Sequence, residues 1–491
     1  MTTKKKTATK AKVKAKKPIK KAPAKKEAVK KPAKKEAVKK PVVKKSTVMR
    51  TKPKEELQQL KPIIMPRSKA TPQSLRGMKD HLPQEQKYWG YVRRAADALA
   101  RAYGFEFIET PILEDTSLFI RSVGIQTDVV EKEMFSFIDR GGSNVTLRPE
   151  GTASVVRAYI NHGMLNMPKP VKLYYMGPMF RYERPQHGRY RQHHQFGVEV
   201  FGDDNPVLDA EVILLAYLFY KEIGIKTLVH INSLGCTECR PVYREELVNY
   251  FRAKRSQLCE DCKRRLSKNP LRLLDCKEEG CAELKEGAPQ IVDSLDDKCK
   301  EHLMHVLEYA DDLQVPYVLD PHLVRGFDYY TRTVFELMPE EGEGSQVALG
   351  GGGRYDTLVE QLGGLETPAC GFGLGLERAI LQMKAQEIEP PSEKGPDVFV
   401  AQLGDNARRK AFTLFEDLRG AGIELAGNFT KNSLKAQLEV SNRLGARFTA
   451  ILGQQEVLDE TVMIRDMESG MQEVVDYKKA VSALKKKLEI S

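Results

Sequence analysis

The segment at residues 180–202, FRYERPQHGRYRQHHQFGVEVFG, holds four arginines, three histidines and two glutamates. Guanidinium groups stay charged and bind pairs of phosphate or carboxylate oxygens, so these arginines suit a phosphorylated ligand. After Gln195, polar and apolar residues alternate. This pattern predicts a strand that returns from a loop and gives Arg181, Gln195 and Glu199 one polar sheet face. An exposed basic hairpin is the competing interpretation.

A second chemically active segment is LRPEGT (147–152), in which Glu150 lies just before an expected helix. The hydroxyl of Thr152 is of the kind that caps a helix N-terminus, and capping alone would also explain the segment.

A third segment, LVRGFDYYTRTVFEL (323–337), has Arg325 ahead of Asp328 and Tyr330. Strand alternation would place Asp328 and Tyr330 on one face. A buried strand rarely carries both Arg and Asp unless they are paired or functional, so this segment is expected to contribute to a site.

Two glycine-rich segments complete the group. GGGGRYD (350–356) permits close approach of a ligand to the backbone, although such a run is more often a flexible turn. In GFGLGLERAI (371–380), Arg378 follows the start of an expected helix, from which it would reach a phosphate. The segment 371–380 lacks the context of a dinucleotide fingerprint, and it has no P-loop sequence.

The elements that would position these segments follow from hydrophobic periodicity, and they alternate between helices and strands. We expect a helix at 83–104, a strand at 105–113 interrupted by Pro111, a strand and helix at 145–163, a strand at 171–183 and a helix at 206–224. A strand at 228–236 leads into a cysteine-rich, helical insertion at about 235–316. We interpret 71–390 as one α+β domain with an antiparallel sheet flanked by helices.

The pattern changes after the charged, proline-containing segment 385–396. Residues 397–491 alternate strands and helices, which predicts a compact α/β domain. No run approaches the roughly 20 apolar residues of a membrane span, and no signal-peptide core follows Met1. We therefore expect a cytoplasmic protein without a membrane partner.

Charge is distributed unevenly along the 491 residues, whose formal net charge is +12. Residues 1–54 contain 22 lysines and Arg50 against two glutamates, which gives +21 and leaves −9 for the rest. The repeated KKEAVKKPA and KKEAVKKPV lack aromatic residues, so we interpret 1–70 as a disordered lysine-rich tail. Two roles for the tail are open: it attracts nucleic acid non-specifically, or it is a solubilising spacer.

Six of the eight cysteines lie within residues 236–281. Two C-x2-C pairs have zinc-like spacing, but residues 240–258 form an expected helix of about 28 Å that would hold the pairs apart. A return of the chain beside the first pair predicts one structural zinc site, with free thiols as the alternative. The expected ligands are Cys236, Cys239, Cys276 and Cys281.

Taken together, the segments resemble histidyl-tRNA synthetases, a family of class II aminoacyl-tRNA synthetases. Residues 180–202 are similar to motif 2, 371–380 to motif 3 and 83–113 to motif 1. The segments LVRGFDYYTRTVFE and GGGGRYD resemble the two histidine-specific motifs. The resemblance covers residues 72–491 and leaves the tail outside.

The resemblance implies a six-stranded antiparallel class II core, a C-terminal anticodon-binding domain and a homodimer formed through motif 1. The implied reaction joins histidine to ATP as histidyl-adenylate, with Mg²⁺, and then transfers histidine to histidine tRNA. Catalysis is assigned to Arg325, Arg181, Gln195 and Glu150. Histidine binding is assigned to Glu150, Thr152, Arg181, Gln195, Glu199, Arg325, Tyr329, Tyr330 and Tyr355. ATP binding is assigned to Arg181, Arg189 and Arg378.

In this scheme Glu199 and Tyr330 bond the two imidazole nitrogens, and Arg325 lies opposite Arg181 across the α-phosphate. The base for the transfer step is open between substrate phosphate oxygens and the pair Gln195 and Glu150. Two departures from the family pattern are Thr357, where Gly is common, and Phe327, where Leu is common.

Three rival functions stay open at this point. A non-catalytic synthetase paralogue that regulates histidine biosynthesis would lack the C-terminal domain and lose the active-site arginines, whereas this chain keeps both. A DNA-compacting role is prompted by the tail. Another class II specificity, such as threonine or proline, would alter the amino-acid pocket.

Overall fold

The structure is a computed structural model that describes residues 71–125, 127–185, 188–340, 348–392, 394–430 and 433–489. The predicted disordered tail, residues 1–70, lies outside the described residues. Among the helices that are described, none has the length and apolar character to cross a membrane.

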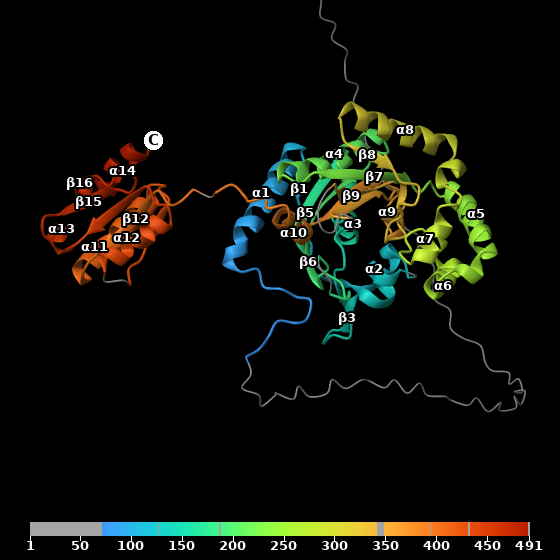
Figure 1. The fold of residues 1–491 in the computed structure, drawn as a ribbon, viewed down its shortest axis with the longest axis horizontal. Coiled ribbons are helices and arrows are strands. Elements are labelled where there is room, and N and C mark those ends of the chain that lie inside the picture. The colour runs from blue at the N-terminus through green and yellow to red at the C-terminus, as the bar shows by residue number, and fades with distance from the viewer. Residues whose placement is uncertain are drawn as a thin grey trace, which may run out of the picture. The chain divides into compact units, whose positions relative to one another are not determined.

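An eight-stranded sheet organises the larger part of the described chain (Figure 1). Its strands lie in the order β1-β5-β6-β11-β10-β9-β7-β8, and the six from β5 to β7 are all antiparallel neighbours. The short β1 and β8 add to the two edges in parallel. The expected six-stranded antiparallel core is therefore confirmed. The bounds are β1 (Glu106–Phe107), β5 (Val171–Phe180), β6 (Gln192–Phe201), β7 (Thr227–Ser233), β8 (Tyr317–Leu319), β9 (Thr331–Pro339), β10 (Gly350–Arg354) and β11 (Ala369–Gly375).

Helices pack on both faces of this sheet. α4 (Pro206–Glu222) is buried on most of its turns because it packs between the sheet and two other helices, α1 (Gln86–Ala102) and α8 (Asp297–Asp312). α10 (Leu376–Ala385) follows β11 directly and packs against α1. α3 (Thr152–Asn161) contacts β6, where Tyr159 stacks on Phe201 at a centroid distance of 4.4 Å. α9 (Leu358–Gln361) packs on α3.

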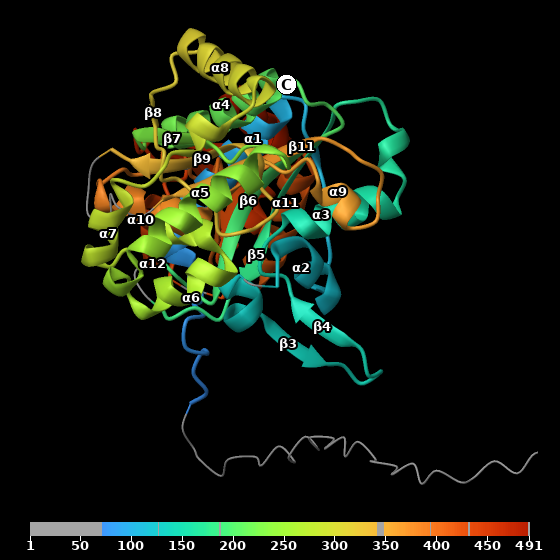
Figure 2. The same cartoon turned by 90° about the vertical axis from the view of Figure 1, so that its right-hand side faces the viewer.

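A smaller antiparallel sheet follows Pro111, where the sequence predicted an interrupted strand: the two pieces, 106–107 and 113–115, lie in different sheets. It has the order β2-β4-β3, with β2 (Leu113–Asp115), β3 (Phe135–Ile138) and β4 (Asn144–Leu147). Figure 2 shows β3 and β4 extending away from the large sheet. α2 (Thr116–Val123) begins where the Asp115 side chain accepts a hydrogen bond from Ser117 N at 2.8 Å.

The insertion lies between β7 and β8, as expected, and is helical. It contains α5 (Cys239–Ala253), α6 (Glu260–Lys268), a 3-10 helix η5 (Pro270–Leu273), α7 (Glu279–Lys285) and then α8. Figure 1 shows α5, α6 and α7 grouped to one side of the large sheet. Buried leucines of this group, such as Leu247 and Leu273, belong to the same apolar core as the sheet.

Residues 398–488 form a separate α/β fold with its own sheet, β13-β12-β14-β15-β16. Alternation along β12 divides two cores: Val398 and Val400 pack with α11 and α14, whereas Phe399 and Ala401 pack on the side of α12. The elements are β12 (Val398–Gln402), α11 (Asp405–Gly420), β13 (Leu425–Gly427), α12 (Leu434–Arg443), β14 (Phe448–Leu452), α13 (Gln454–Leu458), β15 (Thr461–Asp466), β16 (Gln472–Asp476) and α14 (Ala480–Leu488).

Two sequence interpretations were wrong about local structure. The glycine run at 350–353 is a central strand, β10, and not a flexible turn. A Cβ on Gly352 would lie 2.0 Å from the carbonyl oxygen of Gly371, so the close packing of β9, β10 and β11 excludes side chains there. In 323–337, the strand begins only at Thr331, so alternation does not place Asp328 and Tyr330.

Candidate active site

The polar side chains of the candidate site gather around the β6 end of the large sheet. Gln195, Gly197 and Glu199 alternate with buried Phe196 and Val198 along β6, as the sequence pattern predicted. Tyr175 on β5 pairs in register with Gly197, and the missing side chain at Gly197 leaves room for its ring. The segment at 180–202 is thus a strand pair around a loop.

Glu199 is fully buried and accepts hydrogen bonds from three hydroxyl groups. Its Oε1 is 2.8 Å from Thr152 Oγ1 and 3.2 Å from Tyr175 Oη, and its Oε2 accepts from Tyr355 Oη. Burial raises the pKa of Glu199 to about 8, against the opposing effect of these donors. Glu199 is thus a buried carboxyl group surrounded by hydroxyl groups. The sequence reasoning missed Tyr175, which lies opposite Gly197 on the neighbouring strand.

Three tyrosines from two loops lie side by side next to this acid. The ring centroids of Tyr329 and Tyr330 are 4.6 Å apart, and Tyr355 lies 5.6 Å from Tyr329 and 6.4 Å from Tyr330. All three are buried. Such rings present apolar faces and few hydroxyl groups, a surface suited to a flat heterocycle.

Glu150 caps helix α3. Its two carboxylate oxygens accept from the backbone N–H groups of Thr152 at 2.6 Å and Ala153 at 2.9 Å. The expectation that Thr152 would be the cap is therefore wrong, because its hydroxyl binds Glu199 instead. Burial raises the pKa of Glu150.

Arg325 lies above the glycine strand. A Cβ on Gly351 would be 3.0 Å from Arg325 Nη1, so the glycine leaves space for the guanidinium. Arg325 pairs with Glu336 of β9 and lies 5.5 Å from the ring of Tyr330. Its Nε is buried without a hydrogen-bond partner among the described residues. One donor therefore remains for a ligand. Asp328 is not its partner and accepts from Asn269 Nδ2 at 2.7 Å.

Three other arginines converge near the loop between β5 and β6. Arg181 Nε donates to the carbonyl of Pro149 at 2.8 Å, and Arg378 Nε donates to the carbonyl of Gly188 at 3.2 Å. Arg189 Nη1 is 3.5 Å from Glu183 Oε2. Burial lowers the pKa of Arg378, and the charges of Arg189 and Arg181 lower it further. This mutual repulsion marks the three as one cationic group.

His193, which sequence reasoning gave no role, is close enough to Arg181 and Arg378 to feel their charges. Burial, with the charges of Arg181 and Arg378, lowers its pKa to about 3. His193 is therefore neutral at physiological pH. Its two-residue spacing from Gln195 is the signal that could have found it. Gln195 itself lies beside Gly373, whose Cβ would be 3.4 Å from Gln195 Nε2.

A family model for histidyl-tRNA synthetase matches residues 77–379, and a model for an anticodon-binding domain matches 397–487. The histidine–tRNA ligase of Desulforamulus reducens is 49% identical over 411 residues, which are 84% of this chain and 98% of the relative. The corresponding protein of Dehalococcoides mccartyi is 48% identical over 85% of this chain and 100% of the relative. The chain belongs to the histidyl-tRNA synthetase family.

A solved histidyl-tRNA synthetase has the same fold. The apo enzyme of S. aureus superposes with a TM-score of 0.72 at 39% identity and covers 84% of this chain and 100% of that structure. The ATP phosphoribosyltransferase regulatory subunit/histidyl-tRNA synthetase of Bacillus halodurans shares the fold at 22% identity and a TM-score of 0.54, over 77% of this chain and 97% of that structure.

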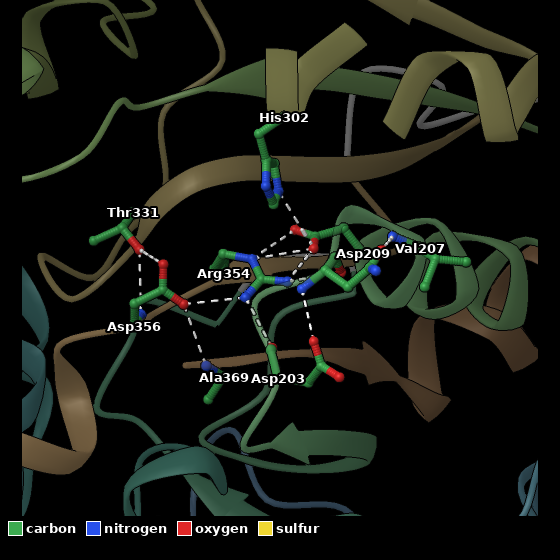
Figure 3. Close-up of polar contacts among 9 residues, drawn as sticks. Asp203, Val207, Asp209, His302, Thr331, Arg354, Asp356 and Ala369 are labelled. Atoms are coloured by element: carbon green, nitrogen blue, oxygen red, sulfur yellow. Dashed lines mark hydrogen bonds and ion pairs between the residues drawn. The ribbon is translucent and has the colours of Figure 1, made fainter. Parts of the chain in front are cut away.

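A buried ionic network joins Arg354 to Asp209 and Asp356, the residues drawn at the centre of Figure 3. Arg354 is fully buried and contacts both oxygens of Asp209, while its Nη1 is 3.2 Å from Asp356 Oδ1. Burial alone would raise the pKa of Asp209, but Arg354 and His302 lower it to about 2. Because Arg354 and Asp356 flank Tyr355 in sequence, the network fixes the backbone that carries it.

The cysteines of the insertion form two groups, and the predicted ligand set is wrong. Helix α5 does separate the two C-x2-C pairs, as expected. However, Cys276 and Cys281 return beside the second pair, since η5 and α7 pack back onto α5 and α6. One group is Cys259, Cys262, Cys276 and Cys281. The other is Cys236, Cys239, Asp296 and Cys299.

Proposed function

We propose that this protein ligates histidine to histidine tRNA, first forming histidyl-adenylate from histidine and ATP. The observation that carries the proposal is the buried Glu199 with its hydroxyl donors, beside tyrosine rings and a group of arginines. An imidazole needs an acceptor for its N–H and aromatic walls, and an α-phosphate needs guanidinium groups.

Histidine recognition rests on Glu199. A carboxylate held by three hydroxyl groups accepts the imidazole N–H, and Tyr330 contributes the second ring contact. An analogue without the N–H leaves this buried acid unpaired, which disfavours its binding. Glu150 keeps free lone pairs beside its two backbone donors and receives the α-ammonium group, with Thr152 and Gln195 nearby. Tyr329 and Tyr355 form the walls.

ATP binding rests on Arg181, Arg189 and Arg378. Arg181 holds the α-phosphate together with the histidine carboxylate, whereas Arg189 and Arg378 hold the outer phosphates. The class II reaction also uses Mg²⁺, which supplies positive charge at the phosphates. Oxygen-rich phosphates and water are the ligands that Mg²⁺ prefers.

Activation is an attack of the histidine carboxylate on the α-phosphorus, which breaks the bond to pyrophosphate. Negative charge develops on the α-phosphate oxygens, and a fixed guanidinium stabilises it without reorganisation. We assign this role to Arg325, which pairs with Glu336 and has a buried Nε–H without a partner among the described residues, and we assign Arg181 to the opposite side of the α-phosphate. For the transfer step, we favour substrate phosphate oxygens as the base, because both carboxylate oxygens of Glu150 already accept backbone hydrogen bonds.

A homodimer formed through 83–113 is part of the proposal. Apolar side chains in and after this segment are exposed: Phe107, Ile112 and Leu113 at 41–49%, and Ile138 on β3 at 68%. A group of exposed apolar residues is typical of an interface.

Two further parts of the proposal concern nucleic acid and location. Residues 397–487 match an anticodon-binding domain, which supports recognition of the anticodon of histidine tRNA. The tail adds non-specific affinity through its lysines. Charging with ATP and tRNA as substrates supports a cytoplasmic location.

The deciding experiment is ATP–pyrophosphate exchange measured with each of the twenty amino acids. Exchange that depends on histidine alone supports the proposal, and exchange driven by threonine or proline would replace it. Absence of exchange with any amino acid would favour the regulatory paralogue.

A further inference from the structure

The first unexplained feature is a group of four thiols between α6 and α7. The Sγ atoms of Cys259, Cys262, Cys276 and Cys281 all lie within 4.8 Å of one another, and those of Cys259 and Cys276 are 3.9 Å apart. In a tetrahedral site with Zn–S bonds of about 2.3 Å, neighbouring sulfurs are about 3.8 Å apart. The thiols are thus already arranged as the ligands of one ion.

The second feature is a similar group at the start of α8. Cys236 Sγ is 3.5 Å from Cys239 Sγ, and both are 3.2 Å from Asp296 Oδ2. Cys299 completes a set whose ligand atoms lie within 4.8 Å of one another. Three thiolates and a carboxylate are a ligand set that Zn²⁺ accepts.

Backbone N–H groups point at the sulfurs in both groups. Cys262 N lies 3.4 Å from Cys259 Sγ, and Cys259 N lies 3.3 Å from Cys281 Sγ. At the other group, Asp296 N lies 3.2 Å from Cys239 Sγ. Such donors favour the thiolate, which is the form that binds metal, and they orient it.

Disulfide bonds and a catalytic metal site explain these cysteines less well than structural metal sites do. All eight cysteines are free, and the quoted sulfur separations are far longer than the roughly 2.05 Å of a disulfide. Each group offers four protein ligands and is largely buried, which leaves no open position for a substrate. That is the arrangement of structural sites, not catalytic ones.

We propose that the insertion binds two structural Zn²⁺ ions, one near each end of helix α5. Cys239 is the first residue of α5, whereas Cys259 follows its last residue by six positions. The helix spans about 22 Å, so the two ions hold separate parts of the insertion. One ion joins β7 to the start of α8, and the other joins α6 to α7.

The two ions also brace the loop that carries Arg325 and the tyrosines. Arg240, next to Cys239, donates from Nη1 to the carbonyls of Asp328 at 3.2 Å and Tyr330 at 3.1 Å. At the other site, Asn269 and Arg272 lie in the sequence between the second and third ligands, Cys262 and Cys276. They donate to Asp328 Oδ1 at 2.7 Å and to the carbonyl of Arg325 at 3.4 Å. Metal loss therefore releases the loop.

The test is the zinc content of the full-length protein, purified without chelator and measured by plasma mass spectrometry. We expect two zinc ions per chain. Cys262→Ser and Cys299→Ser should each retain one, and Cys370→Ser, which removes a buried cysteine outside both groups, should retain two. No bound zinc after reconstitution with ZnCl2 overturns both sites. Iron in place of zinc overturns the assigned metal.

A second measurement guards against variants that fail to fold. Wild-type protein stripped of metal and refilled with Co²⁺ should bind two equivalents and develop thiolate-to-metal charge-transfer absorption. One equivalent, retained in Cys299→Ser and lost in Cys262→Ser, would reject the site at α8. The stripped protein should also show a KM for histidine raised about tenfold and restored by zinc. An unchanged KM would reject the link to the loop, independently of whether exchange itself is specific for histidine.

Discussion

Tyr355 donates a hydrogen bond to Glu199, and both side chains are buried. The donor is fixed by the ionic network on either side of it, and the acceptor lies on the β6 face. The strand and the loop that form the proposed imidazole site are therefore joined before any ligand arrives. This pairing makes Glu199 the most informative position to change.

Glu199→Gln should raise the KM for histidine about 100-fold or more in pyrophosphate exchange, because the amide presents one acceptor where the carboxylate has two. With a pKa of about 8, Glu199 ionises mostly above neutrality. For wild type, kcat/KM for histidine should rise about five-fold from pH 7 to pH 8, following the ionised fraction. The variant should lack this rise. A parallel rise in the variant would assign it to another group.

The same pKa has a consequence for stability. A carboxyl group whose pKa is raised by folding binds more protons in the native state than in the unfolded one. Stability is therefore highest below pH 4.5 for this group and declines as the pH rises to about 8. Thermal unfolding of Glu199→Gln should depend less on pH across this window than that of wild type.

Arg325→Ala should reduce pyrophosphate exchange by about 1000-fold, because it removes a fixed charge from the developing transition state. KM for ATP should change little by comparison, and the oligomeric state by light scattering should be unchanged. Arg332→Ala, on the adjoining strand, is the matched control and should retain exchange. Near-normal exchange in Arg325→Ala would remove this arginine from the mechanism.

Asp209→Ala should destabilise the protein by about 3–5 kcal/mol, since it leaves Arg354 charged and buried without its main partner. Asp203→Ala serves as control: Arg354 contacts Asp203 only through the backbone carbonyl, so this variant should lose less than about 1 kcal/mol. Urea unfolding followed by tryptophan fluorescence compares the two. Equal losses would mean that the network contributes nothing beyond local effects.

Phe107→Glu and Ile112→Glu should convert a dimer to a monomer in light scattering, because each places a charge in an apolar interface. Leu365→Glu is the control: it also replaces an exposed apolar side chain with a charge, but at a 67% exposed position outside the proposed interface. This variant should remain dimeric. Monomeric wild-type protein at micromolar concentration would contradict the proposed dimer.

Deletion of residues 1–54 should weaken binding of non-specific RNA and flatten its dependence on salt, as measured by fluorescence anisotropy. A variant with glutamine at each tail lysine keeps the length and removes the charge. It should behave like the deletion. If it binds like wild type, the tail acts as a spacer.

The sequence was most informative where spacing alone determines neighbours. Alternation along 195–200 predicted the polar face of β6, and helical periodicity placed α1 and α4 to within a few residues. The C-terminal fold was predicted for the same reason, since strands and helices alternate at short intervals.

Sequence reasoning failed where tertiary packing chose between equivalent options. The two C-x2-C pairs and the C-x4-C pair could combine into several ligand sets, and only the return of η5 beside α6 selects one. The run at 350–353 looked like a turn because glycine carries no information on burial. Either Glu150 or Thr152 could have capped helix α3, and the sequence does not show that the Thr152 hydroxyl binds Glu199 and leaves the cap to Glu150.

The cationic group has few acids to neutralise it. Glu183 is shared between Arg189 and Arg181, and no carboxylate forms an ion pair with Arg378 among the described residues. Backbone carbonyls orient these guanidinium groups but leave their charge intact. A polyanion bound at these arginines, as we propose for ATP, would relieve their mutual repulsion and so stabilise the fold. The melting temperature of the protein should climb in the order AMP, ADP, ATP.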